Sequence, residues 1–142
     1  MTYILDTNVL SELRKAPQGR ADANVVAWAE SVSADDFFIS AVTVMEFELG
    51  VLQMERKDAR QGAVLRFWLE HQVLPQFFGR ILPVDVAVAR RCARLHVPDK
   101  RSERDALIAA TALVHDMTVI TRNVVDFEQT GVSIINPWHL RS

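Results

Sequence analysis

The feature that most constrains this chain is the alternation of short apolar runs with longer segments of helical periodicity. The apolar runs, each typical of a buried strand, lie at residues 3–5, 37–39, 80–84, 117–121 and 132–135. Segments with apolar residues at helical spacing separate them, at residues 9–15, 22–32, 40–54, 58–74, 85–96 and 102–115. Strands that alternate with helices predict a mostly parallel sheet with helices on both faces. We therefore expect a three-layer α/β/α fold with four to five strands.

Size and composition predict a single domain over residues 1–142, because 49% hydrophobic and 24% charged residues are ordinary for a globular protein. The 16 basic and 18 acidic residues give a net charge of −2, so a nucleic-acid site would have to be a local patch. The single cysteine, Cys92, excludes an internal disulfide and fits a reducing compartment. No apolar run approaches the roughly 18 residues that span a membrane, and the N-terminus has no export signal. We expect a cytoplasmic protein without a membrane segment.

Local signals predict where several helices begin and end. Thr43 with Glu46, and Ser102 with Asp105, match the capping-box pattern, in which a hydroxyl residue begins a helix and an acid follows three residues later. Pro75 predicts the end of the helix that begins near residue 58, because proline cannot continue a helix interior.

Acidic residues lie at positions that a parallel sheet brings together. Asp6 ends the first strand, and Glu46 lies near the start of the helix after the second. Asp105 begins the helix before the fourth strand, and Asn123 and Asp126 follow that strand. Ligands of open α/β sheets bind beyond the carboxyl ends of the strands. These side chains are far apart in sequence, so only the fold can unite them.

Each acid alone has a structural alternative, as a helix cap or as a first-turn acid. Together they form an all-oxygen ligand set, which suits Mg²⁺ or Mn²⁺. The four histidines share no close ligand spacing, and Cys92 fits a core thiol. Without a cation, several carboxylates in one cleft would repel each other and raise some of their pKa values.

Four stretches resemble the PIN-domain nucleases, specifically the VapC-type toxins of bacterial toxin–antitoxin pairs. They read YILDTNVLSE (residues 3–12), ISAVTVMEFELG (39–50), DALIAATA (105–112) and VITRNVVDF (119–127). The closing VSIINPW (132–138) extends the resemblance almost from end to end. One short stretch would be weak support, whereas four in the family's order are specific.

The resemblance implies a divalent-metal-dependent endoribonuclease in which Asp6, Glu46 and Asp105 hold Mg²⁺ or Mn²⁺. The family often adds a fourth acid after the last catalytic strand, where this chain has Asn123. The acid nearest to that place is Asp126. Either Asn123 contributes a neutral oxygen or Asp126 holds a water of the metal, and Asp126 joins the expected catalytic acids. Around them we expect supporting contacts from three residues: Thr7, Asn8 and Thr121.

The implied reaction is attack of a metal-activated water on an RNA phosphodiester bond. The implied biological role is that of the toxin in a type II toxin–antitoxin module, neutralised by a cognate antitoxin. The toxin would reach operator DNA only through the antitoxin complex. Residues 42–68 carry more apolar surface than two helices need to bury on one face. The resemblance assigns the excess to a homodimer contact and to a groove for the antitoxin's C-terminal segment.

Six of the basic residues lie just before Asp105: Arg90, Arg91, Arg94, Lys100, Arg101 and Arg104. A charge run of this kind is usually a solvated helix face. Beside a metal site it is equally well a patch that guides an RNA backbone through its phosphates. Arg104, next to Asp105 in the sequence, is the expected substrate contact.

Two other functions fit parts of the pattern. A receiver-like signalling domain also has acids at the carboxyl edge of a small α/β fold. It requires an acceptor aspartate after the third strand and a lysine after the fifth, where this chain has Pro83-Val84 and Asn136-Pro137. A PIN module that scaffolds RNA or protein without cutting stays open, because Asn123 stands where the family often has an acid.

Overall fold

The computed structural model describes residues 1–139. A five-stranded sheet runs through its centre, in the order β3-β2-β1-β4-β5, and all four strand pairs are parallel. The strands are short: β1 (Tyr3–Leu5), β2 (Phe37–Ser40), β3 (Ile81–Leu82), β4 (Thr118–Ile120) and β5 (Ile134–Ile135). The predicted fold class is confirmed, with a sheet that is parallel throughout.

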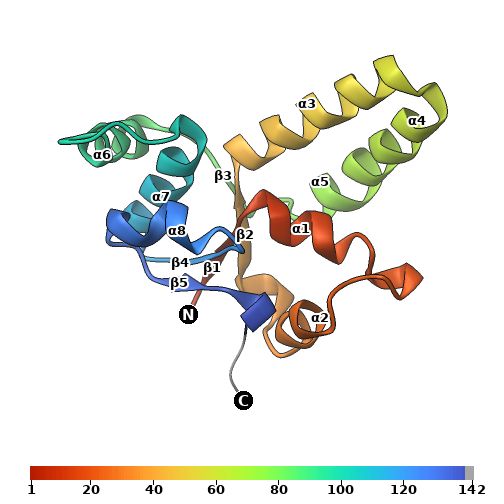
Figure 1. The fold of residues 1–142 in the computed structure, drawn as a ribbon, viewed down its shortest axis with the longest axis horizontal. Helices are drawn as coiled ribbons and strands as arrows, with labels where there is room; N and C mark the ends of the chain where they lie inside the picture. The colour runs from red at the N-terminus through yellow and green to blue at the C-terminus, as the bar shows by residue number, and fades with distance from the viewer. Residues whose placement is uncertain (140–142) are drawn as a thin grey trace.

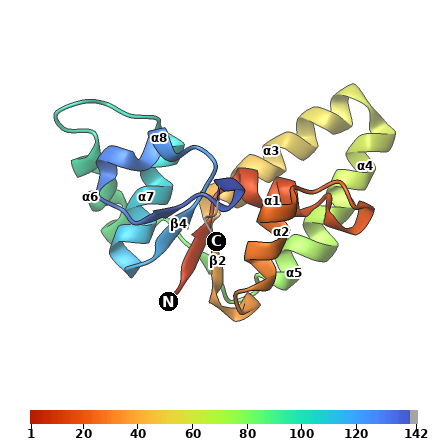
Figure 2. The same cartoon turned by 60° about the horizontal axis from the view of Figure 1, so that its bottom comes forward.

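Helices cover both faces of the sheet (Figures 1 and 2). They are α1 (Thr7–Leu13), α2 (Ala23–Glu30), α3 (Ala41–Lys57), α4 (Ala59–Trp68), α5 (Leu74–Gln76), α6 (Val86–Leu95), α7 (Glu103–His115) and α8 (Val124–Phe127). In Figure 2, α6, α7 and α8 lie on one side of the strands, and α1, α2 and α5 lie on the other. The helices α3 and α4 form a hairpin that projects from the sheet (Figure 1).

The alternation of side chains along each strand produces two cores. Leu5 and Ile120 face the cluster formed with α1 and α2, whereas Ile4 and Val119 face the cluster formed with α7. Successive residues of a strand point to opposite faces, so a strand covered on both sides must be apolar throughout. This is why the predicted strands appear in the sequence as continuous apolar runs.

Gly62 allows the two helices of the hairpin to pack closely. A Cβ atom at this position would lie 2.5 Å from the Cα of Glu55, far inside any real contact. From the same helix, Arg66 forms ion pairs with three acids of the hairpin and the turn after it: Glu48, Glu55 and Glu70. The close contact and the ion pairs hold α4 against α3.

The start of α3 corrects a predicted cap. The helix begins at Ala41, and the Ser40 hydroxyl accepts a 2.9 Å hydrogen bond from the backbone N–H of Val42. Ser40 is therefore the cap, not Thr43, because the helix follows directly on β2. Thr43 lies inside the first turn with its side chain fully buried. The second predicted box is also incomplete, since Ser102 occupies the N-cap position of α7 but its side chain makes no capping hydrogen bond.

Pro75 does not end its helix as predicted. The chain passes from α4 through a π-helical segment, Leu69–Val73, into α5, which contains Pro75 near its start. The helical path continues to Gln76 because Pro75 occupies a first-turn position of a new segment, where its missing N–H is tolerated. Leu69 and Val73 of the π-helical segment are buried in the core.

Within residues 1–139, no helix has the length and apolar character needed to cross a membrane.

Candidate active site

The strand order brings three chain segments to one edge of the sheet. Because β1 pairs with both β2 and β4, the residues that follow these three strands are neighbours. Asp6 follows β1, the first turn of α3 follows β2, and Thr121 follows β4. The candidate residues therefore meet beyond the carboxyl ends of the strands, where ligands of such sheets bind.

Asp6 is the most buried acid of the site, with 5% of its surface exposed. Its Oδ1 accepts a 2.8 Å hydrogen bond from the backbone N–H of Thr7, so it does cap α1. Its Oδ2 accepts hydrogen bonds from the hydroxyl of Thr121 at 2.7 Å and from Nδ2 of Asn8 at 3.3 Å. The capping and pocket roles of Asp6 are thus compatible, because each carboxylate oxygen has its own donors.

Glu46 points toward the same place from α3. Its Oε1 accepts a 3.0 Å hydrogen bond from the hydroxyl of Thr7, and Nη1 of Arg104 lies 3.8 Å from its Oε2. The Thr7 hydroxyl also lies 3.5 Å from that of Thr43. Thr7 therefore links the start of α1 to the first turns of α3. Arg104 is the cation that pairs with Glu46 among the described residues.

The pKa values of three acids report their proximity. Burial raises the pKa of Asp6, and the negative charge of Asp126 adds to this while the Thr121 and Thr7 hydrogen bonds oppose it. Burial also raises the pKa of Glu46, which the Thr7 hydrogen bond opposes and the charge of Asp6 reinforces. For Asp105, burial and then the charges of Asp6 and Asp126 raise the pKa. The acids therefore form one electrostatically coupled cluster, the acidic cluster, made of Asp6, Glu46, Asp105 and Asp126.

The two residues proposed after β4 differ in their relation to this cluster. Asp126 is exposed on the single turn of α8, and its charge acts on both Asp6 and Asp105. Asn123 is exposed at the N-cap of α8, where its side chain makes no capping bond, and its backbone N–H donates to the Thr121 hydroxyl at 3.0 Å. The charge that reaches the cluster from this segment is that of Asp126.

The donor set of the acidic cluster suits a hard divalent cation, since it consists of carboxylates with nearby hydroxyl and amide groups. As a set, its carboxylate oxygens do not come within 4.8 Å of one another among the residues that the structure describes. Like charges in a partly buried cleft are unfavourable without a counter-ion. Burial is the largest cause of the raised pKa values of Asp6, Glu46 and Asp105, and the charges of neighbouring acids add to it.

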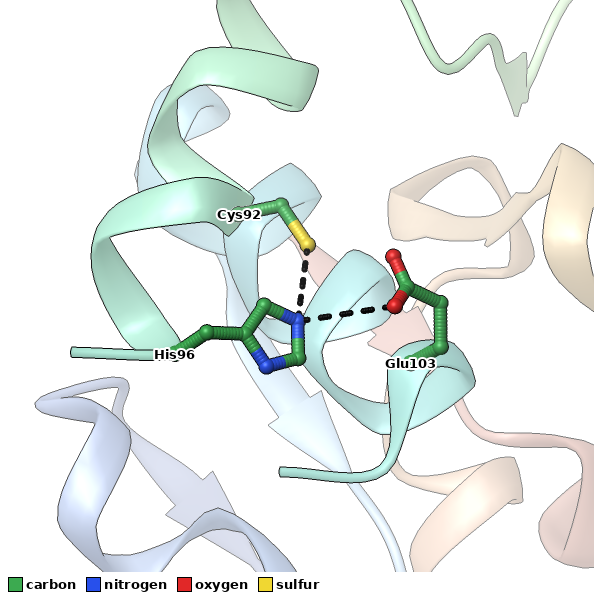
Figure 3. Close-up of side chains that lie close together, drawn as sticks. All are labelled: Cys92, His96 and Glu103. Atoms are coloured by element: carbon green, nitrogen blue, oxygen red, sulfur yellow. Dashed lines mark hydrogen bonds and ion pairs between the residues drawn. The ribbon is translucent and has the colours of Figure 1, made fainter. Parts of the chain in front are cut away.

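A different trio is closer together: Cys92 of α6, His96 at the C-cap of the same helix, and Glu103 of α7 (Figure 3). Nε2 of His96 lies 3.8 Å from both Cys92 Sγ and Glu103 Oε2. However, Nδ1 of His96 accepts a 3.1 Å hydrogen bond from the backbone N–H of Arg101, so Nδ1 carries no proton and Nε2 carries one. A metal on Nε2 would need the opposite tautomer, in which Nδ1 donates. We therefore assign this trio to the packing of α6 on α7, and Cys92 remains a buried thiol whose pKa is raised by burial.

A pocket adjoins the acidic cluster on the hairpin side. Its volume is about 310 Å³, and it reaches from Thr7 and Glu46 to apolar residues of α3 and α4. The lining residues are Thr7, Ser11, Arg14, Glu46, Phe47, Gly50, Val51, Leu65 and Trp68. Several large apolar side chains of the hairpin are exposed: Met45, Leu49, Leu52, Val64 and Phe67. The excess apolar surface that the sequence predicts is therefore present.

The predicted basic run divides into separate environments. Arg101 is structural, because its side chain donates to the backbone oxygens of Leu95 and Gln129. Arg104 approaches Glu46, as described above. Arg90, Arg91 and Arg94 line a shallow hollow of about 250 Å³ together with Ala87 of α6 and Val114 of α7. The run is not one continuous track to the acidic cluster.

Sequence reasoning missed Arg122. Its guanidinium carbon lies 5.2 Å from the ring centre of Trp138, and its backbone N–H donates to Oδ1 of Asn8 at 3.3 Å. The arginine follows Thr121 directly, which was the available signal. The contact with Trp138 depends on the pairing of β4 with β5 and has no local signature.

Comparison with known proteins identifies the family. The family model described as PIN domain matches residues 3–132. The chain belongs to the PIN-domain family. The resemblance drawn from the sequence is thereby confirmed, and the receiver-like alternative loses its support.

Close relatives of this PIN domain carry toxin and ribonuclease names. It is 42% identical to "Toxin FitB" of Neisseria gonorrhoeae, over 96% of this chain and 98% of the relative. It is 40% identical to "VapC ribonuclease Y4jK" of Sinorhizobium fredii, over 95% of this chain and 96% of the relative. Among solved structures, FitAB bound to an IR36 DNA fragment has a chain with a TM-score of 0.88 and 38% identity, covering 99% of both chains. A toxin–antitoxin complex from Klebsiella pneumoniae has a TM-score of 0.69 and 25% identity, covering 98% of this chain and 100% of that one.

Proposed function

We propose that this PIN domain, spanning residues 1–142, is the toxin of a type II toxin–antitoxin module and acts as a Mg²⁺- or Mn²⁺-dependent endoribonuclease. The observation that carries the proposal is the acidic cluster. Its acids Asp6, Glu46 and Asp105 come from three separate segments and have raised pKa values, and the exposed Asp126 adds its charge to Asp6 and Asp105. Such a cluster is unfavourable by itself, so a divalent cation is the natural counter-ion. The ribonuclease name of a relative that is 40% identical over nearly its whole length supports RNA as the substrate.

Asp6, Glu46 and Asp105 would hold the cation. When bound, the cation activates water and neutralises charge on the phosphate oxygens. Asp6 is kept ready as a ligand because Thr121, Asn8 and the N–H of Thr7 donate to it and favour its ionised form. Thr7 orients Glu46 in the same way. Asp126, exposed at the rim, adds negative charge and can hold a water at the edge of the site.

Arg104 would contact Glu46 in the free protein and a phosphate in the RNA complex. It lies beside Glu46 while the site is free of RNA, and it is exposed enough to contact a phosphate when RNA arrives. Its guanidinium can bind a phosphate through two parallel hydrogen bonds. This contact would position the strand without reading its sequence.

The pocket beside Glu46 is the proposed binding site for the antitoxin. It joins the acidic cluster to apolar residues of the hairpin, so an amphipathic segment could cover both with its apolar side inward. The solved toxin–antitoxin complex from Klebsiella pneumoniae supports a partner of this kind. We also propose that the exposed apolar residues of the hairpin form a homodimer contact, that operator DNA is reached only through the antitoxin, and that the protein acts in the cytoplasm.

The test is RNA cleavage by the purified protein in the presence of Mg²⁺ or Mn²⁺. We expect cleavage that EDTA abolishes, and we expect Asp6→Asn and Asp105→Asn to lower the rate at least 100-fold, since each removes a charged ligand. Asp35→Asn is the control. Asp35 is an exposed acid in the turn that precedes β2, and this variant should cleave like wild type. Cleavage that persists unchanged in both variants would sink the assignment. Binding of RNA without cleavage would favour the non-cutting scaffold instead.

A further inference from the structure

We propose that Arg122 is a substrate-binding residue that holds a phosphate of the RNA strand on the β4 side of the acidic cluster. This inference rests on the proposed function and extends it, because it names a second anchor for the strand beside the cluster.

The backbone of Arg122 is fixed next to the cluster. Thr121, the preceding residue, donates to Asp6 at 2.7 Å. The N–H of Arg122 itself donates at 3.3 Å to Oδ1 of Asn8, whose Nδ2 donates to Asp6 at 3.3 Å. Two hydrogen-bonded routes thus connect the Arg122 backbone to the most buried acid.

The guanidinium itself is held by a rigid aromatic ring. It stacks over Trp138 at 5.2 Å from the ring centre. The ring is 8% exposed, and hydrogen bonds of 3.0 Å fix its residue through Asn24, which donates to the Trp138 carbonyl, and Asn136, which accepts from its N–H. An arginine stacked in this way has lost much of its conformational freedom before a ligand arrives.

The donors of this guanidinium have no acceptor in residues 1–139: no ion pair within 4.0 Å and no side-chain hydrogen bond is formed there. Other arginines near the site differ. Arg104 lies beside Glu46, and Arg101 donates to backbone oxygens. Arg14, although stacked on Trp68, lines the pocket on the hairpin side. Arg122 therefore offers, after β4, a guanidinium that is held on Trp138 and has no acceptor among residues 1–139.

The acidic cluster explains why a cation is needed there. An RNA strand that approaches several carboxylates is repelled by them, and a bound divalent ion compensates only at its centre. A stacked arginine whose donors have no acceptor among residues 1–139 matches the geometry of a phosphate and is weakly hydrated, so it can bind one at small cost. A contact of this kind fixes the strand without selecting bases.

The test is RNA binding rather than cleavage. In an Asp105→Asn background, which prevents cutting, the affinity for a short fluorescein-labelled single-stranded RNA of mixed sequence is measured by anisotropy over a salt series. We expect Arg122→Gln to weaken binding about tenfold and to reduce the slope of log affinity against log salt by about 0.7, the value for one phosphate contact with a single strand. Arg122→Lys should keep the slope but lose part of the affinity, because lysine provides charge without the planar fork.

Arg56→Gln is the matched control, since Arg56 is an exposed arginine about 15 Å along α3 from Glu46. It should leave both affinity and slope unchanged. Arg122→Gln with parental affinity and slope overturns the inference, whatever the wild type does to RNA. Failure of the proposed function is separate: the parent then binds RNA with its Arg122 dependence intact, while the wild type does not cleave. A parent that does not bind RNA at all overturns both.

Discussion

The hydroxyl of Thr121 donates a 2.7 Å hydrogen bond to Oδ2 of Asp6, across 115 positions of sequence. The bond joins the residues that follow two adjacent parallel strands, β1 and β4. Both groups are buried, so the bond is formed in surroundings of low polarity, where it is stronger than in water. It lowers the pKa of Asp6 against the larger effect of burial. Thr121 thus helps to keep the central acid ionised.

Thr121→Val should therefore weaken the metal site without changing its shape. We expect a 10- to 100-fold loss in Mn²⁺ affinity or cleavage rate, as is common when a group that supports a metal ligand is removed. Thr118→Val is the matched control, because Thr118 is a buried threonine of β4, the strand that Thr121 follows, and its side chain makes no hydrogen bond among the described residues. Equal loss in the two variants would mean that the effect comes from packing in β4.

The stability of the metal-free protein should depend on pH through the acidic cluster. The pKa values of Asp6, Glu46 and Asp105 are raised in the folded chain, so the folded state binds more protons than the unfolded state between the ordinary and the raised values. The free energy of unfolding then falls as pH rises through that window, and the stabilisation present below the ordinary values is lost. Thermal unfolding in EDTA should give a higher Tm at mildly acidic than at neutral pH from these groups. A Tm that rises steadily toward neutral pH, in EDTA and in Asp105→Asn alike, would contradict this.

Asp105→Asn provides the complementary measurement at neutral pH. It removes one of the repelling charges, so we expect its Tm in EDTA to exceed that of wild type by a few degrees, on the order of 1 kcal/mol. Mg²⁺ should raise the Tm of wild type, since a ligand that binds only the folded state stabilises it, but should not raise that of the variant. The exposed-acid variant Asp35→Asn should respond to both conditions like wild type.

Two glycines of the hairpin should respond to alanine in opposite directions. Gly62→Ala places a Cβ atom against the backbone of Glu55 and should lower the free energy of unfolding by roughly 1–3 kcal/mol, because the two helices must move apart. Gly50→Ala meets no atom within 4 Å inside the same hairpin and should raise it by about 0.5–1 kcal/mol. Chemical denaturation of the two variants measures both effects. Similar destabilisation by both would rule out the proposed close contact at Gly62.

Asp126 and Asn123 can be separated by substitution. Asp126→Asn should weaken Mn²⁺ binding severalfold, because the charge of Asp126 acts on both Asp6 and Asp105. Asn123→Ala should have a smaller effect, because the contact of this residue with the network is made by its backbone N–H, which alanine retains. The opposite order in calorimetric titrations would assign the fourth position of the site to Asn123.

The sequence predicts the fold class well because each strand is mostly apolar and the helical segments between the strands have apolar residues at helical spacing. It also predicts Asp6, Glu46 and Asp105 as neighbours, since the carboxyl ends of parallel strands share an edge. The strand order, with β1 at the centre, has no local signal in runs of two to four residues. The capping error at Thr43 arises because Ser40 and Thr43 are both suitable caps, and only the end of β2 decides between them.

The basic run shows a second limit. Six charges close in sequence suggest one surface. However, the Arg101 side chain donates to backbone oxygens, and the three arginines of α6 line a separate hollow with Val114 of α7. Conversely, Arg122 and Trp138 lie in contact although α8 and β5 separate them in the sequence, so no local sequence pattern predicts the contact. Whether an exposed arginine is free or engaged depends on backbone oxygens and aromatic rings that tertiary structure supplies.

The central claim is that Asp6, Glu46 and Asp105 form one divalent-metal site. Calorimetric titration of Mn²⁺ into wild type and into Asp6→Asn, Glu46→Gln and Asp105→Asn tests it most directly, with Asp35→Asn as the control. We predict saturable binding by wild type and the control, and a loss of at least tenfold in affinity in each of the other three, because each would remove a charged ligand. Wild-type Mn²⁺ affinity in all three variants would contradict the claim.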